Sequence, residues 1–231
     1  QNKKNKNRIN NKDEFQSFVD NTKIVEANKN SINNDEFPSF VDDSKIFEIK
    51  KDKIKSNDLT KLANYWETDK GDKFGCQHNY TQYYQIYFDK INHKKIELFE
   101  IGIARGSSLK VWSSYFNNIN IDSIDINVNC KNLCKDYDNI NLIIADINKI
   151  NLDKQYDIII DDGSHLPSDI INSFNKLEKN LKEDGIYIIE DLYADIEYLN
   201  FLFEYKKEEY SNNFDLFKEA NNHTVLTNFI K

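Results

Sequence analysis

The sequence is poor in several residue types, and each scarcity limits what the protein can be. Its 231 residues include three cysteines, two prolines, six glycines and no methionine. Cys76, Cys130 and Cys134 form neither an even disulfide framework nor a C-x-x-C pair, so we assign none of them a catalytic or metal-binding role. No apolar run approaches the ~18 residues of a membrane span, and the start lacks the apolar stretch of a signal peptide. We expect a soluble cytoplasmic protein.

A basic excess is also absent. The 31 Lys and Arg residues are outnumbered by 39 Asp and Glu residues, and the formal net charge is -8. Because contacts with nucleic acid phosphates need a clustered excess of Lys and Arg, this balance argues against a nucleic-acid partner. We expect a small-molecule or glycan substrate and no membrane partner, while a homo-oligomer remains open.

The first 57 residues differ from the rest of the chain and contain a repeat. Residues 13–20 (DEFQSFVD) recur as residues 35–42 (DEFPSFVD). Two copies are fewer than the about three that small repeats need to build a core. We expect an Asn/Lys-rich extension at 1–57, which is either a partner-docking motif or a featureless linker. A helical lid segment at 58–95 and a Rossmann-like domain at 96–231 should follow.

Apolar runs alternate with amphipathic stretches from Ile96 onward, which is typical of βαβ units and a parallel sheet. The predicted strands cover residues 96–103, 119–126, 140–144, 156–161 and 185–189. A helix is predicted from Pro167, with Ile170, Ile171, Phe174, Leu177 and Leu181 at helical spacing. The pattern predicts an α/β fold with a doubly wound, mostly parallel sheet, whose ligands bind at the carboxyl ends of the strands.

A glycine loop, E-I-G-I-A-R-G-S-S at residues 100–108, follows the first predicted strand. Glycines let the backbone approach a ligand, and the next helix begins with unpaired N–H groups. A dinucleotide fingerprint needs G-x-G-x-x-G, but Ala104 replaces its second glycine and Gly106 falls one place early. The spacing disfavours a nicotinamide oxidoreductase and favours S-adenosylmethionine, with a purely structural turn as the alternative.

Acidic residues follow the next two predicted strands. Asp125 ends the second strand, where its carboxylate can accept hydrogen bonds from both hydroxyls of a ribose. Asp146 follows the third strand and is placed to border the adenine, although an exposed loop aspartate is nearly as consistent with the sequence.

Carboxylates also gather after the last two predicted strands. Asp161, Asp162 and His165 belong to the run D-D-G-S-H, and Glu190 and Asp191 follow the next strand. Such a group is repulsive without a cation, and its oxygen ligands favour a hard ion such as Mg²⁺. His165 alone would suit a helix cap or the core, but beside these carboxylates it is a candidate general base.

A third cluster precedes the first predicted strand. Thr68-Asp69-Lys70-Gly71 is followed by His78-Asn79-Tyr80-Thr81 and then by Tyr83, Tyr84 and Tyr87. Tyrosines at this density form either an aromatic wall over a ligand or the packing face of a lid helix.

Taken in order, these motifs resemble a known family. Residues 65–195 are similar to the macrolide sugar O-methyltransferases of the mycinamicin type, a branch of the class I S-adenosylmethionine-dependent methyltransferases. The matching motifs are T-D-K-G at 68–71, H-x-Y-T at 78–81, E-I-G-x-x-x-G-S-S-L-K-x-W at 100–112, D-I at 125, I-I-D-D-G-S-H at 159–165 and E-D-L at 190–192.

The resemblance implies a set of site residues. Magnesium ligands would be Asp162, Glu190 and Asp191, and His165 would be the base. The implied cofactor-binding residues are Thr68, Lys70, Glu100, Gly102, Gly106, Ser107, Asp125, Asp146 and Asp161, with the Thr68 segment closing over the cofactor.

Two departures from the family pattern bear on these expectations. Ser107 stands where the family has a second glycine after Gly106. Residues 192–231 are few for the helix and antiparallel strand pair that end such sheets, which leaves open a sheet without these last strands. We expect magnesium-dependent methyl transfer to a sugar hydroxyl of a glycan or glycosylated metabolite. The alternative is a non-catalytic nucleotide-binding module that recruits partners through its N-terminal repeats.

Overall fold

The computed structural model describes residues 48, 50–191, 214–218 and 225–230. All of these residues belong to one compact unit, which spans residues 43–231. The duplicated repeat of the predicted extension lies outside the described residues. Among the described residues, no helix has the length and apolar character needed to span a membrane.

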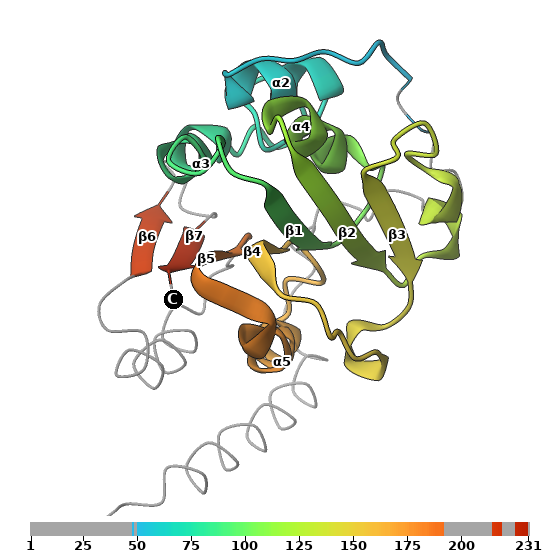
Figure 1. Cartoon of the computed structure of the whole chain (residues 1–231), viewed down its shortest axis with the longest axis vertical. Coiled ribbons are helices and arrows are strands. Elements are labelled where there is room, and N and C mark those ends of the chain that lie inside the picture. The colour runs from blue at the N-terminus through green and yellow to red at the C-terminus, as the bar shows by residue number, and fades with distance from the viewer. Residues whose placement is uncertain (1–47, 49, 192–213, 219–224, 231) are drawn as a thin grey trace, which may run out of the picture. The chain divides into compact units, whose positions relative to one another are not determined.

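A sheet of seven described strands, in the order β3-β2-β1-β4-β5-β7-β6, forms the centre of this unit (Figure 1). The strands are β1 (Ile96–Ile101), β2 (Ile119–Asp125), β3 (Ile140–Ile144), β4 (Tyr156–Asp161), β5 (Leu181–Ile189), β6 (Phe214–Lys218) and β7 (Val225–Ile230). The first five pair in parallel, whereas β7 pairs antiparallel with both β5 and β6. The doubly wound, mostly parallel sheet expected from the sequence is confirmed.

The sheet ends with an antiparallel pair, so the possibility that these strands were missing is wrong. Ile186–Ile189 of β5 pair with Thr227–Ile230 of β7, and β7 continues through Val225 to pair with β6. The segment 192–231 is long enough for this pair, because β6 has only five residues and β7 only six.

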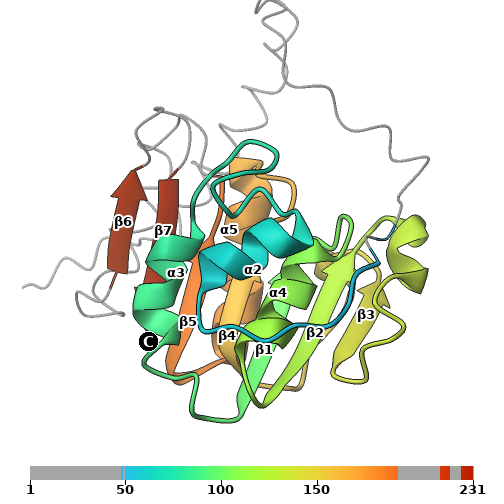
Figure 2. The ribbon, with the colours of Figure 1, turned by 90° about the horizontal axis from the view of Figure 1, so that it is seen from above.

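Helices cover both faces of the sheet (Figures 1 and 2). On one face lie α2 (Leu59–Trp66), α3 (Thr81–Phe88) and α4 (Ser107–Tyr115), and on the other lies α5 (Pro167–Leu177). Ile158 and Ile160 of β4 pack in the core cluster beneath α2, α3 and α4. Successive residues of a strand point to opposite faces, so Ile159 points toward α5. All three isoleucines are fully buried, as the unbroken apolar run predicts.

Short 3₁₀ helices complete the connections: η3 (Val128–Asn132), η4 (Ile147–Lys149) and η5 (Glu178–Asn180). Several predicted boundaries differ: β1 ends at Ile101 and not at residue 103, β2 ends at Asp125 and not at residue 126, and β5 begins at Leu181 and not at residue 185. Leu181 was placed in the helix that begins at Pro167, but α5 ends at Leu177, and Leu181 begins β5 and pairs with Tyr156. Leu181 is buried at a position that also fits the helical period, so its apolar character did not distinguish the two elements.

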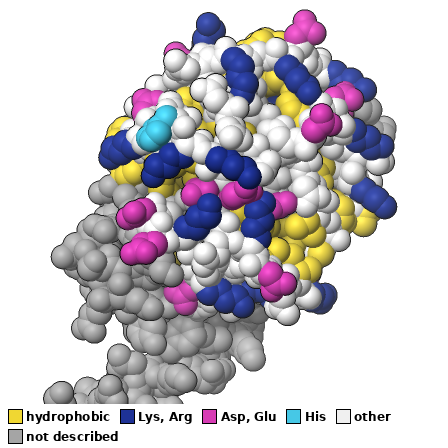
Figure 3. Space-filling model, viewed as in Figure 1, with side chains coloured by type: hydrophobic (Ala, Val, Ile, Leu, Met, Phe, Trp, Pro, Cys, Tyr) yellow, Lys and Arg dark blue, Asp and Glu magenta, His cyan; other side chains and the backbone are white. Residues whose placement is uncertain are grey.

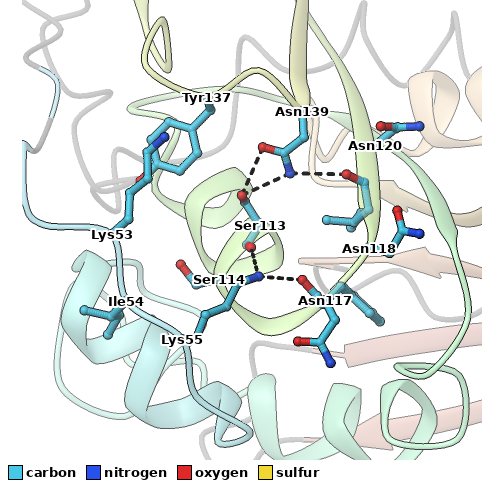
Figure 4. Close-up of a pocket in the computed structure, with 12 residues that line it drawn as sticks. Lys53, Ile54, Lys55, Ser113, Ser114, Asn117, Asn118, Asn120, Tyr137 and Asn139 are labelled. Atoms are coloured by element: carbon cyan, nitrogen blue, oxygen red, sulfur yellow. Dashed lines mark hydrogen bonds between the residues drawn. The ribbon is translucent and has the colours of Figure 1, made fainter.

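Residues 50–57, the last part of the predicted extension, contact the body of the unit through lysines. Lys51 donates to the carbonyl of Tyr65, and Lys53 donates to that of Asp136. Lys55 Nζ donates to Ser113 O at 2.7 Å and Phe116 O at 2.6 Å, at the carboxyl end of α4 (Figure 4). A cation there satisfies unpaired carbonyls and complements the helix dipole. The contacts of the body therefore begin before the predicted boundary.

The pocket in Figure 4 lies beside this lysine segment, at the end of α4 and the start of β2. Asn139, which precedes β3, bonds Ser113 and the carbonyl of Ile119 across it. These residues stand at the amino ends of the parallel strands. Ligands of doubly wound sheets bind at the carboxyl ends, so this pocket is separate from the candidate active site. On the face shown in Figure 3, Lys and Arg side chains lie among Asp and Glu side chains.

Candidate active site

The glycine loop after β1 passes very close to the chain that leaves β4. Gly102 has a φ of 96°, and a Cβ at this position would lie 2.1 Å from the carbonyl oxygen of Asp162. A side chain there is therefore excluded both by conformation and by space. The two motifs that the sequence placed at separate strand ends are in backbone contact at this point.

The start of α4 offers unpaired polar groups to a ligand. Gly106 is the N-cap, with a φ of 72° and no side chain to bond the first N–H groups of the helix. The Ser107 hydroxyl is buried and has no hydrogen-bond partner among the described residues. Buried polar groups in proteins are nearly always bonded, so an orphaned hydroxyl beside a glycine loop fits a polar ligand. Both residues belong to the predicted cofactor set.

Glu100 is fully buried beneath this loop. It accepts hydrogen bonds from Ser108 Oγ at 2.7 Å and Trp112 Nε1 at 2.6 Å, which tie α4 to β1. Burial raises the pKa of the Glu100 carboxyl to about 7, although the Lys70 ammonium opposes the shift. Glu100 therefore holds α4 against β1. The cofactor contact that the sequence predicts for it stays a prediction.

Two further predicted cofactor residues lie at strand ends. At the end of β2, Asp125 Oδ2 accepts from the amides of Ile103 at 2.9 Å and Ala104 at 3.3 Å, so it fastens the glycine loop. Asp146 follows β3 and caps η4 by accepting from Asn148 N at 2.9 Å. Neither side chain is fully buried, and both remain accessible to a ligand at this edge of the sheet.

Asp161 ends β4, as predicted, but the contacts of its side chain lie in the α5 layer. It is buried, and it accepts a hydrogen bond from Ser173 of α5. Because side chains alternate across a strand, Asp161 points away from Ile160 and toward the α5 layer. Burial raises the pKa of this carboxyl to about 6. Its contacts support a role in docking α5 and give no support to contact with a cofactor.

Lys70 lies between two of the predicted magnesium ligands. Its Nζ is 2.6 Å from Asp162 Oδ2 and 2.5 Å from Glu190 Oε2, and its side chain is 3% exposed. Burial lowers the pKa of this ammonium, but the carboxylates raise it well above its usual range, so the lysine is charged. The sequence assigned Lys70 to the cofactor; the structure pairs it with the carboxylates. Thr68, also in the predicted set, is buried beside it and accepts from Lys70 N at 3.5 Å.

Two tyrosines of the aromatic cluster donate hydrogen bonds to the same carboxylates. The Tyr80 hydroxyl lies 2.6 Å from Asp191 Oδ1, and the Tyr84 hydroxyl bonds Glu190 Oε1. Burial, followed by the nearby carboxylates, raises the pKa of both phenols, which keeps them protonated as donors. The sequence left these tyrosines between a ligand wall and a packing face. Their hydroxyls instead orient the carboxylates, a role that residue density alone does not indicate.

His165 lies between the carboxylates of Asp162 and Asp191. Its Nε2 is 3.9 Å from Asp162 Oδ1 and 3.7 Å from Asp191 Oδ2, and the imidazole is 27% exposed. The backbone places Glu190 next to this group, because Glu190 N donates to Asp161 O at 2.9 Å and continues the β4–β5 ladder. The structure therefore brings the predicted base, His165, and all three predicted metal ligands to one edge of the sheet.

The donor set fits a divalent cation in part. One ligand atom each from Asp162, His165 and Asp191 lies within 4.8 Å of the others. Burial raises the pKa of Asp162 and that of Glu190, and the Lys70 ammonium opposes this shift in both. When ionised, the carboxylates of Asp162, Glu190 and Asp191 together carry more negative charge than Lys70 balances. A cation would relieve this excess. Both oxygens of Glu190, the third predicted metal ligand, accept hydrogen bonds here, one from Lys70 and one from Tyr84.

Known proteins are similar to this chain in sequence. Mycinamicin VI 2''-O-methyltransferase of Micromonospora griseorubida is 31% identical over 151 residues, which cover 59% of this chain and 36% of that protein. A rhamnosyl-tetracenomycin 3'-O-methyltransferase of Streptomyces olivaceus is 29% identical over 151 residues, covering 59% and 37%. The chain thus spans little more than a third of the length of these curated relatives. No family model matches the sequence.

The fold has solved counterparts. The MycE methyltransferase of the mycinamycin pathway, solved with Mg, S-adenosylhomocysteine and mycinamycin VI, superposes with a TM-score of 0.60 at 23% identity, covering 76% of this chain and 55% of that one. At this identity the likeness concerns the fold. The described chain therefore has the Rossmann-like fold of the class I methyltransferases, and its sequence resembles those of the macrolide and sugar O-methyltransferases.

Proposed function

We propose that this protein transfers a methyl group from S-adenosylmethionine to a sugar hydroxyl of a glycan or glycosylated metabolite, in a reaction that depends on Mg²⁺. The contact between the two motifs carries the proposal. Gly102 lies against the carbonyl of Asp162. A ligand bound at the glycine loop would therefore reach the carboxylates and the imidazole. A methyl donor and an acceptor hydroxyl must meet at such a point.

Several features support S-adenosylmethionine as the ligand of the loop. The start of α4 suits its carboxylate, and Asp125 suits the ribose hydroxyls. Ile126 and Val128, which follow Asp125, are 75% and 70% exposed and offer an apolar surface to a flat base. Sequence analysis missed this pair, although an apolar residue directly after a strand-end aspartate is a recognisable signal. When bound, S-adenosylmethionine supplies an electrophilic methyl group.

His165 is the residue that we assign to the proton. Its Nε2 would accept the proton of the attacking hydroxyl, and the carboxylates of Asp162 and Asp191 on either side would stabilise the imidazolium. Asp162 and Asp191 would also hold Mg²⁺, which when bound lowers the pKa of a hydroxyl group that it contacts. Lys70 and the tyrosines keep the carboxylates in position and exclude water from the buried side of the cluster.

The class of acceptor rests on the relatives. The names of those proteins specify O-methylation of mycinamicin VI and of a tetracenomycin that bears a rhamnosyl group. An acidic cluster that holds a cation suits a neutral polyhydroxylated acceptor, because adjacent hydroxyl oxygens are ligands that hard cations accept. We therefore extend the substrate class of these relatives to this chain.

Calorimetry on the full chain tests the cofactor. S-adenosylhomocysteine should bind at micromolar strength, while NAD should bind more weakly or not at all. Asp125→Asn should weaken S-adenosylhomocysteine by about 1–3 kcal/mol, the scale of hydrogen bonds to a charged acceptor. Asp153→Asn, at an exposed aspartate away from the loop, is the matched control. Tighter binding of NAD would end the methyltransferase assignment.

Label transfer tests the reaction. Tritiated S-adenosylmethionine is incubated with Mg²⁺ and a panel of rhamnosides that carry free vicinal hydroxyls. His165→Ala should lower kcat by about 10² to 10⁴, with S-adenosylhomocysteine affinity unchanged. His93→Ala removes a histidine outside the site and should leave both values alone. Full turnover in EDTA, or an unimpaired His165→Ala enzyme, would contradict the mechanism while leaving the cofactor assignment intact.

A further inference from the structure

A second group of metal-ligating side chains lies on the loop between α2 and α3. One ligand atom each from Asp69, Cys76 and His78 lies within 4.8 Å of the others. The three atoms are an oxygen, a sulfur and a nitrogen, and this mixture differs from the oxygen-rich cluster around Asp162. Borderline-soft ions such as Zn²⁺ accept all three donor types, whereas Mg²⁺ does not take thiolate.

The backbone of the loop is arranged so that these side chains meet. His78 N donates to Asp69 O at 2.8 Å, which sets the two residues side by side, and Asn79 N donates to Gly71 O at 3.0 Å. Gln77, between Cys76 and His78, has a φ of 54°. A left-handed conformation costs a residue with a Cβ about 1–2 kcal/mol, and such strain is concentrated at functional sites.

The imidazole of the group is held in a fixed orientation. The His78 ring stacks on Tyr80 with centroids 5.0 Å apart and planes 11° apart. Its Nε2 lies 3.7 Å from Asp69 Oδ2 and 3.8 Å from Asp191 Oδ1. Outer contacts that orient a ligating histidine raise metal affinity, so this stacking favours binding. The imidazole therefore lies between the carboxylates of Asp69 and Asp191.

We propose that Asp69, Cys76 and His78 form a binding site for a zinc-type divalent cation, with water as the fourth ligand. On binding, the Cys76 thiol gives its proton to solvent and the sulfur bonds the metal as thiolate, with no change in oxidation state. The ion would hold together the loop between α2 and α3, which carries Lys70 and Tyr80. This assigns a role to Cys76 that the sequence pattern did not indicate. Asp69, Cys76 and His78 are separate from the residues proposed to hold Mg²⁺, so the proposal does not rest on the methyltransferase function.

Cobalt substitution gives a direct test on the full chain. Titration with Co²⁺ should produce a thiolate-to-cobalt charge-transfer band that saturates at one equivalent, and Zn²⁺ should displace it. Cys76→Ser, at an exposed position, should abolish the band and weaken Zn²⁺ binding at least about 100-fold. Cys134→Ala, which removes a buried thiol, should keep the band. No band in the wild type, or an undiminished band in Cys76→Ser, would overturn the proposal.

The histidine variants separate this site from the cluster around Asp162. His78→Ala should lose the band, whereas His165→Ala and His93→Ala should retain it. Zinc X-ray absorption of the wild type keeps the test open if a variant does not fold: the proposal requires one sulfur in the first coordination shell, and a shell of nitrogen and oxygen alone would refute it. A band that survives in His78→Ala would show that the ligand set is wrong.

Discussion

Replacing Lys70 by methionine should unbalance the buried carboxylate cluster more than any surface substitution can. The ammonium makes ion pairs of 2.6 Å with Asp162 and 2.5 Å with Glu190, and no more than 3% of its side chain is exposed. Methionine keeps most of the side-chain length and removes the charge. Leaving buried carboxylates without their cation typically costs about 3–5 kcal/mol of folding free energy. Since a domain has only about 5–15 kcal/mol in total, this is a large fraction.

The loss should depend on pH with a definite sign. Burial raises the pKa of Glu190 and of Asp162, and removing the ammonium raises both further. A carboxyl whose pKa is higher in the folded state adds stability that is complete below the unfolded value of about 4 and is lost as the pH rises through the folded value. The deficit of Lys70→Met relative to wild type should therefore be largest near about pH 8 and smaller near about pH 5.

Urea denaturation followed by the fluorescence of the buried Trp66 and Trp112 measures this deficit. Lys154→Met is the matched control, because Lys154 also bridges two carboxylates at 2.7 Å but is 40% exposed. That variant should lose less than about 1 kcal/mol. Mg²⁺ at about 100 times its dissociation constant should restore about 2.7 kcal/mol to Lys70→Met. A deficit no larger than that of Lys154→Met, or one that grows as the pH falls, would refute the reasoning.

Three further predictions follow from single contacts. Burial raises the pKa of Glu100 from 4.5 to about 7, so its ionisation costs stability across that interval; Glu100→Gln should remove about 3 kcal/mol of this pH dependence in urea titrations. Gly102→Ala should cost at least about 2 kcal/mol and abolish S-adenosylhomocysteine binding in calorimetry, whereas Gly163→Ala, without a positive φ, should cost less. Deleting residues 1–47 should leave the affinity for S-adenosylhomocysteine unchanged. Deleting residues 1–55 should lower the midpoint of urea unfolding, because this deletion removes Lys51, Lys53 and Lys55.

The central strand β4 could be predicted because it is buried on both faces of the sheet. Ile158, Ile159 and Ile160 have no polar neighbour in their run, and only a covered strand tolerates such a sequence. The predicted bounds of β3 and β4 agree with the structure. The antiparallel end was harder to predict, since β6 and β7 pair with each other and with β5 through backbone bonds that carry little sequence signal.

Site residues could be predicted where they directly follow the end of a strand. The partners of long side chains could not, because these side chains contact residues far away in the sequence. Gly102, Asp125 and Asp162 follow directly from the order of the strands. The partner of Lys70 does not, because its ammonium reaches residues 92 and 120 positions away. Asp161 shows a second limit of prediction from sequence. Adjacent residues at a strand end point to opposite faces of the sheet, so the pair Asp161-Asp162 supplies one carboxylate to each face.

Asp191 connects the two cation sites that we propose. Its Oδ1 accepts from Tyr80 and lies 3.8 Å from His78, while its Oδ2 lies 3.7 Å from His165. The residue is 8% exposed and its Oδ1 is held by the Tyr80 hydroxyl, so little freedom remains for the carboxylate to turn. A cation held by Asp69, Cys76 and His78 would thus compete for the negative charge that stabilises an imidazolium at His165. The loop between α2 and α3 would then influence the proton-accepting residue through this shared carboxylate, without any movement of the sheet.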